Sequence, residues 1–126
     1  MKTDKHRLEQ IAKFGNELLE VIREDAITKD DILSNKRIQW LITTPLFNIG
    51  EQANCLSAEF VDNHWEMGWN RIAGLRHRLV HNYEGTNWEI IAEVVFEKLP
   101  ILIEQTQAIL NQLYEEENCL DKCDPK

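Results

Sequence analysis

The sequence predicts an all-α protein, folded as an antiparallel up-and-down four-helix bundle with space for one short additional helix. Apolar residues recur at steps of three and four in four segments, which is the period of an amphipathic helix. The connections between these segments are short, and no segment shows the alternation of a half-buried strand. The 126 residues, 43% of them hydrophobic, suit a single domain over 1–126, with a disordered tail expected over about 118–126.

The first two helices are expected on either side of a break near residue 26. The first covers about 4–24. Thr28 then stands three residues before Asp31, a pairing typical of the capping box that starts a helix. We expect the second helix as one long element over about 29–59 that bends at Pro45, because its apolar stripe continues across this proline: Ile38, Leu41, Ile42, Ile49, Ala53 and Leu56.

The third and fourth helices follow a connector expected at 62–64. The third is predicted over about 67–82, from residues at helical spacing: Trp65, Trp69, Ile72, Leu79 and Val80. Thr86 and Glu89 have the spacing of a second capping box and open the fourth helix. This last helix is long, with a kink expected at Pro100.

The composition excludes several classes of protein. The formal net charge of −8 argues against a general nucleic-acid coat protein, because such binding depends on Lys and Arg at the phosphates. No apolar run is long enough to cross a membrane and no signal-peptide pattern is present, so we expect a cytoplasmic protein that does not bind membranes.

The three cysteines are expected to be reduced thiols rather than disulfides. Cys55 lies in a helical stretch, whereas Cys119 and Cys123 lie in the polar tail. The last two are one helical turn apart and could share a metal ion, but two soft ligands without a third favour a frayed tail. We therefore expect no metal site and no cofactor.

A basic segment stands out in this acidic chain. Residues 67–83 contain no carboxylate and carry five basic side chains: Arg71, Arg76, His77, Arg78 and His81. On an ideal helix Arg76 and Tyr83 share a face, whereas His81 lies about 140° from Arg76. Either the helix unwinds at His81 or a second copy completes the site. We expect both, with a C2 homodimer forming one groove for an RNA strand.

The octapeptide 76–83 carries a known signature. Its pattern Arg76-x4-His81-x-Tyr83 resembles the R-x4-H-x-Y motif of HEPN proteins, and specifically of the HepT toxins that are paired with a minimal nucleotidyltransferase. Other positions over nearly the whole chain also resemble this family: Gly50-Glu51, Trp69, Gly74 and Leu99-Pro100. One position departs from a common family variant, because His77 stands where that variant carries Asn or Asp.

The resemblance implies a dimeric four-helix bundle that cleaves RNA without a metal and is silenced by a nucleotidyltransferase. It implies that Arg76 and His81 are catalytic, and that Tyr83 is the residue to which the partner transfers AMP. An arginine can stabilise the charge of the transition state, and a histidine can transfer a proton near neutral pH. Four further residues are expected to support RNA binding: Glu51, Arg71, His77 and Arg78.

Structural interpretations of the same residues remain open. Arg76 could form an ion pair with Glu51, if the second and third helices pack together. His77 and His81 have the spacing of a helical zinc pair, but a third ligand is missing unless Glu84 turns back toward them. The four tryptophans could stack on bases, but at helical spacing they are assigned to the core or to a dimer interface. The acidic run 115–117 is interpreted as a solvated helix end rather than a contact with an antitoxin.

Two other functions remain open besides that of a ribonuclease. The chain could be a non-catalytic partner of a nucleotidyltransferase that helps to present its substrate, although a scaffold has no need of the Arg-His-Tyr set. The basic groove could also hold DNA, although chemistry at a 2′-hydroxyl would exclude its cleavage. RNA cleavage separates the first alternative from a ribonuclease.

Overall fold

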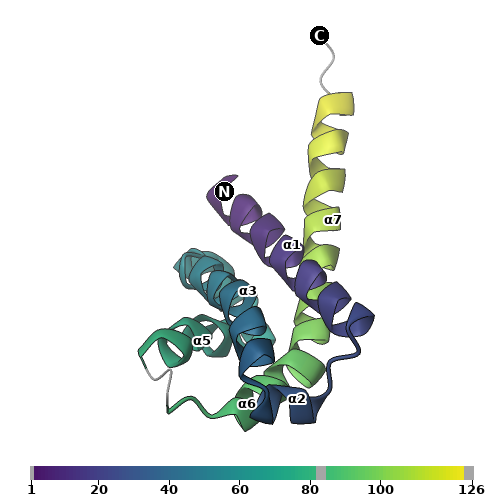
Figure 1. Ribbon diagram of the computed structural model, residues 1–126. Helices are drawn as coiled ribbons and strands as arrows, with labels where there is room; N and C mark the ends of the chain where they lie inside the picture. Colours follow the sequence, from purple (N-terminus) through teal and green to yellow (C-terminus); the bar gives the residue numbers. More distant parts are fainter. Residues whose placement is uncertain (1, 82–84, 124–126) are drawn as a thin grey trace.

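The computed structural model describes the backbone of residues 2–81 and 85–123, and the side chains of 4–79 and 85–118. This part of the chain contains helices and no strand, which confirms the all-α fold (Figure 1). The elements are α1 (Lys2–Glu24), α2 (Lys29–Ser34), α3 (Lys36–Asn54), α4 (Ala58–Asn63), η1 (Trp65–Met67), α5 (Trp69–His81), α6 (Trp88–Glu93), η2 (Val94–Lys98) and α7 (Leu99–Cys123).

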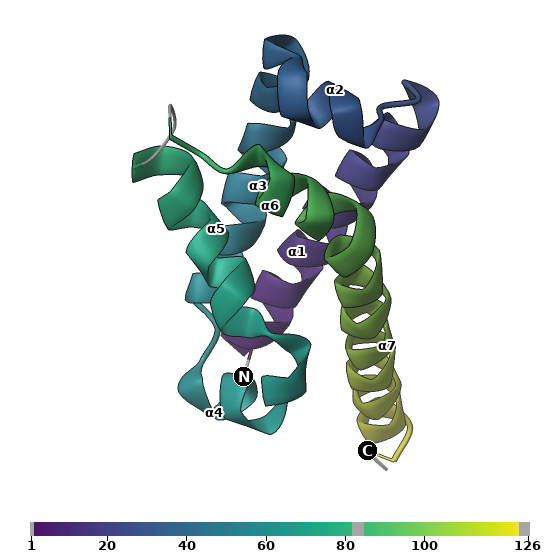
Figure 2. The same cartoon turned by 90° about the horizontal axis from the view of Figure 1, so that it is seen from below.

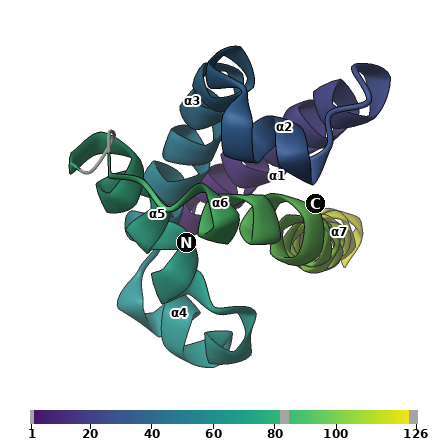
Figure 3. The same ribbon diagram turned by 60° about the horizontal axis from the view of Figure 1, so that its bottom comes forward.

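The long helices form the bundle. α3 packs between α1 and α5, and α1 also packs on α7. The short helices α2 and α6 lie side by side and close one end of the bundle (Figure 3). None of the described helices is long and apolar enough to cross a membrane.

The core is the joint apolar face of these helices. Its fully buried residues come from every long helix: Leu8 and Ile11, Ile42, Leu46 and Ile49, Trp69 and Leu79, Leu99 and Leu110. Where α1 crosses α7, the side chain of Ile103 fills the space over Gly15, which has no Cβ to obstruct it. The sequence predicted this apolar stripe on each helix, and burial of the stripes is the main force that holds the bundle together.

The predicted second helix is interrupted. Thr28 and Asp31 form the expected capping box at the start of α2. However, a new helix begins after Asn35, whose side chain accepts hydrogen bonds from the backbone N–H groups of Arg37 and Ile38 at 3.0 and 3.3 Å. One helix over 29–59 was therefore wrong, because Asn35 stabilises a second helix start. The helix does continue through Pro45, as expected.

The connector expected at 62–64 was also wrong. The chain leaves α3 after Asn54, and Ser57 caps α4 by accepting a hydrogen bond from the backbone N–H of Phe60. Asp4 of α1 fixes this cap, because its carboxylate accepts hydrogen bonds from the Ser57 N–H at 2.9 Å and from the Ser57 hydroxyl at 2.6 Å. Gly68, with φ of 70°, then separates η1 from α5.

The last helical segment starts one residue later than the capping-box pattern predicted. Asn87, rather than Thr86, caps α6 through its side chain. The expected kink at Pro100 is preceded by the π-helical turn η2, in which the Leu99 N–H donates to the Val94 carbonyl. Pro100 has no N–H to donate, so the regular pattern cannot continue through this turn. α7 extends to Cys123, into the tail expected from 118, and residues 124–126 lie outside the described residues.

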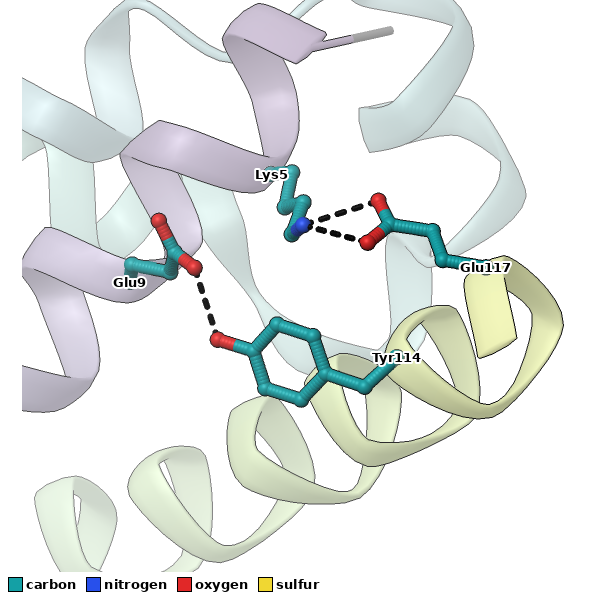
Figure 4. Close-up of polar contacts among 4 residues, drawn as sticks. All are labelled: Lys5, Glu9, Tyr114 and Glu117. Atoms are coloured by element: carbon teal, nitrogen blue, oxygen red, sulfur yellow. Dashed lines mark hydrogen bonds and ion pairs between the residues drawn. The ribbon is translucent and has the colours of Figure 1, made fainter. Parts of the chain in front are cut away.

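The C-terminal part of α7 extends past the other helices, as Figure 1 shows, and polar contacts hold it to α1. Lys5 forms an ion pair with Glu117 at 2.8 Å, and the Tyr114 hydroxyl donates a hydrogen bond to Glu9 at 2.7 Å (Figure 4). The hydrogen bond to the Glu9 carboxylate raises the pKa of Tyr114, with smaller contributions from burial and from the charges of Glu9 and Glu117.

Candidate active site

The basic segment lies on α5 and its side chains point in different directions. Arg71 and Arg78 are seven residues apart and therefore share one side of the helix, where both are exposed. Arg76 lies on the side that packs against α3. His77 is exposed on α5. The helix thus separates Arg76 from the other two arginines.

Arg76 contacts Glu51 of α3 across the helix interface. The distance between Arg76 Nη1 and Glu51 Oε1 is 3.3 Å, which confirms the ion pair that the sequence had left as an alternative. The two side chains are 41% and 42% exposed, so the pair adds at most about 1 kcal/mol to the free energy of unfolding. Its larger effect is to hold the guanidinium in one orientation at the surface.

The Arg76 guanidinium also has unused hydrogen-bonding capacity. Its Nε atom is buried and has no hydrogen-bond partner among the described residues. A guanidinium offers its donors in a planar fork that matches two oxygens of a phosphate or carboxylate. The Arg76 side chain is 41% exposed, so the part of its guanidinium at the surface can bind an anion at the edge of the α3–α5 interface, whereas the buried Nε cannot.

Gly50 explains why the two helices approach so closely at this point. A Cβ atom at Gly50 would lie 3.0 Å from both the Arg76 backbone nitrogen and the Ile72 carbonyl oxygen. These atoms belong to the α5 backbone and cannot move aside as a flexible side chain does. Gly50 and Glu51 thus have different roles. The glycine allows α5 to pack closely against α3, and the glutamate forms the ion pair with Arg76.

The remaining members of the motif are only partly described. α5 stays helical through His81, so the unwinding considered for this residue is not present, although its side chain lies outside the described residues. Tyr83 lies outside the described residues altogether. Positions 76 and 81 are consequently about 140° apart around the axis of one helix. The geometry of this chain alone does not bring them together.

An open groove runs between α5 and the α6–α7 segment. Figure 2 shows α5 and α7 on either side, with α6 crossing between them. The groove has a volume of about 820 Å³, within the range of about 300–1,000 Å³ that is typical of ligand sites. Arg71 and Arg78 line it from α5, and Lys98 lines it from η2. These three cations form no ion pair with another described residue.

Sequence reasoning missed Lys98 because it lies outside the basic segment and belongs to no motif. It also assigned all four tryptophans to the core or to a dimer interface. Trp69 is buried in the core, but Trp65 is 76% exposed and lines the groove, and Trp40 is 55% exposed on α3. Trp65 and Trp40 are therefore not core residues of this chain, and the alternative of a dimer interface stays a prediction for both. Gly68 could have indicated the exposure of Trp65, because a glycine at this position interrupts the helical pattern between Trp65 and Trp69 and so separates Trp65 from the buried face of the helix.

The residues considered for metal binding do not form a cluster in the described part of the chain. No group of three or more His, Cys, Asp or Glu is found there. Cys55 is an exposed free thiol, whereas the side chains of Cys119, Cys123 and His81 lie outside the described residues.

Comparisons with known proteins give a consistent result. A family model described as "Ribonuclease HepT-like" matches residues 5–109. A "Putative RNase" of Caldanaerobacter subterraneus subsp. tengcongensis is 32% identical over 112 residues, which cover 89% of this chain and 98% of the relative. A "Putative RNase" of Methanocaldococcus jannaschii is 33% identical over 95 residues, which cover 75% of this chain and 78% of the relative.

A third relative, the "Probable ribonuclease HepT" of Thermococcus cleftensis, is 31% identical over 101 residues, which cover 80% of this chain and 90% of the relative. No solved structure matches the chain significantly. The range matched by the family model includes Glu51 and Arg76 as well as the whole groove.

Proposed function

Because the chain belongs to the HepT-like ribonuclease family, we propose that it is a metal-independent endoribonuclease that acts as the toxin of a toxin–antitoxin module. The catalytic residues of the proposal are Arg76 and His81. The observation that carries it is the position of Arg76, which pairs with Glu51 at the edge of the α3–α5 interface and is 41% exposed, so that its guanidinium can reach a phosphate.

The proposed reaction is a transfer of the phosphodiester to the neighbouring 2′-oxygen. His81 accepts the proton of the ribose 2′-hydroxyl, the 2′-oxygen bonds to phosphorus, and the bond from phosphorus to the 5′-oxygen breaks. The imidazolium then gives its proton to the leaving 5′-oxygen. The products are a 2′,3′-cyclic phosphate and a 5′-hydroxyl.

Arg76 stabilises the negative charge that this reaction develops on the non-bridging oxygens of the phosphate. Its guanidinium binds the non-bridging oxygens, and such contacts are strongest in the pentavalent transition state. Arg71, Arg78 and His77 support RNA binding on the exposed face of α5. Because both proton transfer and charge stabilisation are assigned to side chains, the proposed mechanism needs no metal or cofactor.

The proposed active form is a homodimer in the cytoplasm. Positions 76 and 81 face different sides of α5, so a second copy related by a two-fold axis would supply the missing group to each cleft. The pairing of two basic segments would also raise the local positive potential, which offsets the net charge of −8 where RNA binds.

A cognate minimal nucleotidyltransferase is the proposed antitoxin. It would transfer AMP to the Tyr83 hydroxyl, with release of pyrophosphate when ATP is the donor. The added phosphate would compete with RNA for Arg76, so the toxin is silenced without unfolding. Co-expression with a nucleotidyltransferase encoded beside this gene, followed by mass spectrometry, should detect one AMP on wild-type protein and none on Tyr83→Phe.

The ribonuclease is tested by cleavage of labelled RNA in EDTA, with the product ends identified. We expect cleavage to cyclic phosphate ends by the wild type and its loss in His81→Ala and Arg76→Ala. Arg37→Ala, which removes an exposed arginine at the start of α3, is the matched control and should cleave normally. Cleavage that survives both site substitutions would refute the assigned mechanism.

A further inference from the structure

The groove between α5 and the α6–α7 segment places two residues that the proposed function does not use, Lys98 and Trp65, beside Arg71 and Arg78. It joins three cations to a large exposed aromatic side chain, Trp65. We propose that this groove holds a single-stranded stretch of the RNA substrate, with one base stacked on Trp65 and the phosphates along Arg71, Arg78 and Lys98. The inference rests on the proposed ribonuclease function and extends it to the form of the substrate.

Trp65 is exposed to a degree that folding alone does not explain. An indole left 76% accessible gains little from burial, and large aromatic side chains on surfaces are typical of binding sites. Every nucleobase has a face that can stack on an indole, and this contact needs an unpaired base. A base in a duplex is already stacked on its neighbours, so the side chain favours a single strand.

The backbone around Trp65 is held in place. Met67 donates a backbone hydrogen bond to the His64 carbonyl at 3.1 Å, and Gly68 donates one to the Trp65 carbonyl at 3.2 Å. The His64 ring stacks on Phe60, with 4.3 Å between the ring centroids. The backbone that carries the Trp65 side chain is thus fixed by these contacts in the absence of RNA, which reduces the entropy lost on binding.

The cations are placed along the groove rather than at one point. Arg71 and Arg78 are two helical turns apart, a rise of about 10 Å along α5, which is the length of about three stacked nucleotides. Lys98 lines the groove from η2 on the α6–α7 side. Phosphates of one strand can therefore meet cations on both sides.

The groove is not uniformly basic. Glu66 and Glu93 also line it, and they lower its net positive charge. Charge alone would therefore give weak binding, and stacking on Trp65 should provide much of the affinity. The salt dependence of binding should be shallow, because only a few phosphates are neutralised.

Apolar side chains also line the groove, among them Ile90, Val94 and Ile101. A second copy of the chain is therefore the competing occupant. The three cations form no ion pair within the described part of the chain, and this favours RNA over an apolar interface, because burying an unpaired charge between two proteins is costly. The experiment below measures the oligomeric state so that the two occupants are distinguished.

The test measures binding of a fluorescein-labelled 12-nucleotide RNA by anisotropy, in His81→Ala protein so that the probe stays intact. Adding Trp65→Ala should weaken binding roughly tenfold. Trp40→Ala removes another exposed tryptophan, outside the groove, and should leave the affinity unchanged. Lys98→Gln should weaken binding several-fold, whereas Lys13→Gln, an exposed lysine of α1, should not. Annealing the probe to its complement should abolish the effect of Trp65→Ala.

Equal RNA affinity with and without Trp65 would overturn the inference. So would a fall in oligomeric state in Trp65→Ala, measured by sedimentation, because the groove would then be an interface between copies. Cleavage by protein with native His81 is measured separately. RNA binding that depends on Trp65, without cleavage, would support RNA binding in the groove and contradict the ribonuclease function. Cleavage together with binding that does not depend on Trp65 would support the ribonuclease function and contradict RNA binding in the groove.

Discussion

Gly50 and Arg76 lie in direct backbone contact, since a Cβ at Gly50 would come within 3.0 Å of the Arg76 nitrogen. A glycine inside a helix costs about 1 kcal/mol relative to alanine, so its presence in α3 needs a reason. The close approach of α5 is that reason. The contact that allows α5 to approach α3 also determines where the Arg76 side chain reaches the surface.

Replacing Gly50 by alanine should therefore destabilise the protein. The gain of about 1 kcal/mol in helix propensity is outweighed by an overpacking cost of about 1–3 kcal/mol, because α5 must move away from α3. Gly74→Ala is the matched control, since a Cβ there meets no described atom within 4 Å, and it should gain up to about 1 kcal/mol. Urea denaturation measures both changes. Equal effects of the two substitutions would contradict the assigned contact.

Glu51→Gln should affect cleavage more than stability. The ion pair is half-exposed, so the free energy of unfolding should change by less than about 1 kcal/mol. RNA cleavage should fall, because Arg76 loses the charge that orients it. Glu59→Gln, an exposed position on α4, should change neither quantity. The positioning role is wrong if Glu51→Gln cleaves RNA at the wild-type rate.

Thr106→Val should stabilise the protein. Thr106 is fully buried in α7, and its hydroxyl has no hydrogen-bond partner among the described residues. Burying an unpaired hydroxyl is unfavourable, and valine has the same shape, so we expect a gain of about 1 kcal/mol in urea denaturation. Thr106→Ser keeps the hydroxyl and loses a methyl group, so it should cost about 1 kcal/mol. A loss of stability in the valine variant would show that the hydroxyl is satisfied.

The contact between Tyr114 and Glu9 should weaken at alkaline pH. The hydrogen bond to Glu9 raises the pKa of Tyr114, so the folded state holds this proton more tightly than the unfolded state. The stabilisation is therefore complete below the ordinary tyrosine pKa of about 10 and is lost as the pH rises through the higher value of the folded protein. Tyr114→Phe should be less stable than wild type at pH 8, and the difference should shrink above pH 10. A difference that does not depend on pH would contradict this linkage.

Local signals in the sequence predicted much of this fold. Amphipathic periods located the long helices, and the pattern at Thr28 and Asp31 located the start of α2. The break at Asn35 was missed because the apolar period is nearly unchanged across it. One polar side chain decides there between a continuous helix and two.

The sequence predicted only the part of the site that one motif on one helix, residues 76–83, contains. The Arg76–Glu51 pair was foreseen as a possibility because both residues lie on helices that a bundle packs together. The groove was not foreseen, because its cations and Trp65 come from three elements, η1, α5 and η2. A periodic pattern does not show between which helices a groove is left open.

The π-helical turn η2 also constrains how the length of this gene can vary. A π turn holds an additional residue compared with the α-helical turn that it replaces. α6 packs on α2 whereas α7 packs on α1. The additional residue of the π turn therefore sets the rotation of the buried face of α7 relative to the buried face of α6. Deleting one codon within 94–98 would rotate one face by about 100° relative to the other. Insertions and deletions among homologous genes should therefore avoid this turn and fall in the connections between helices.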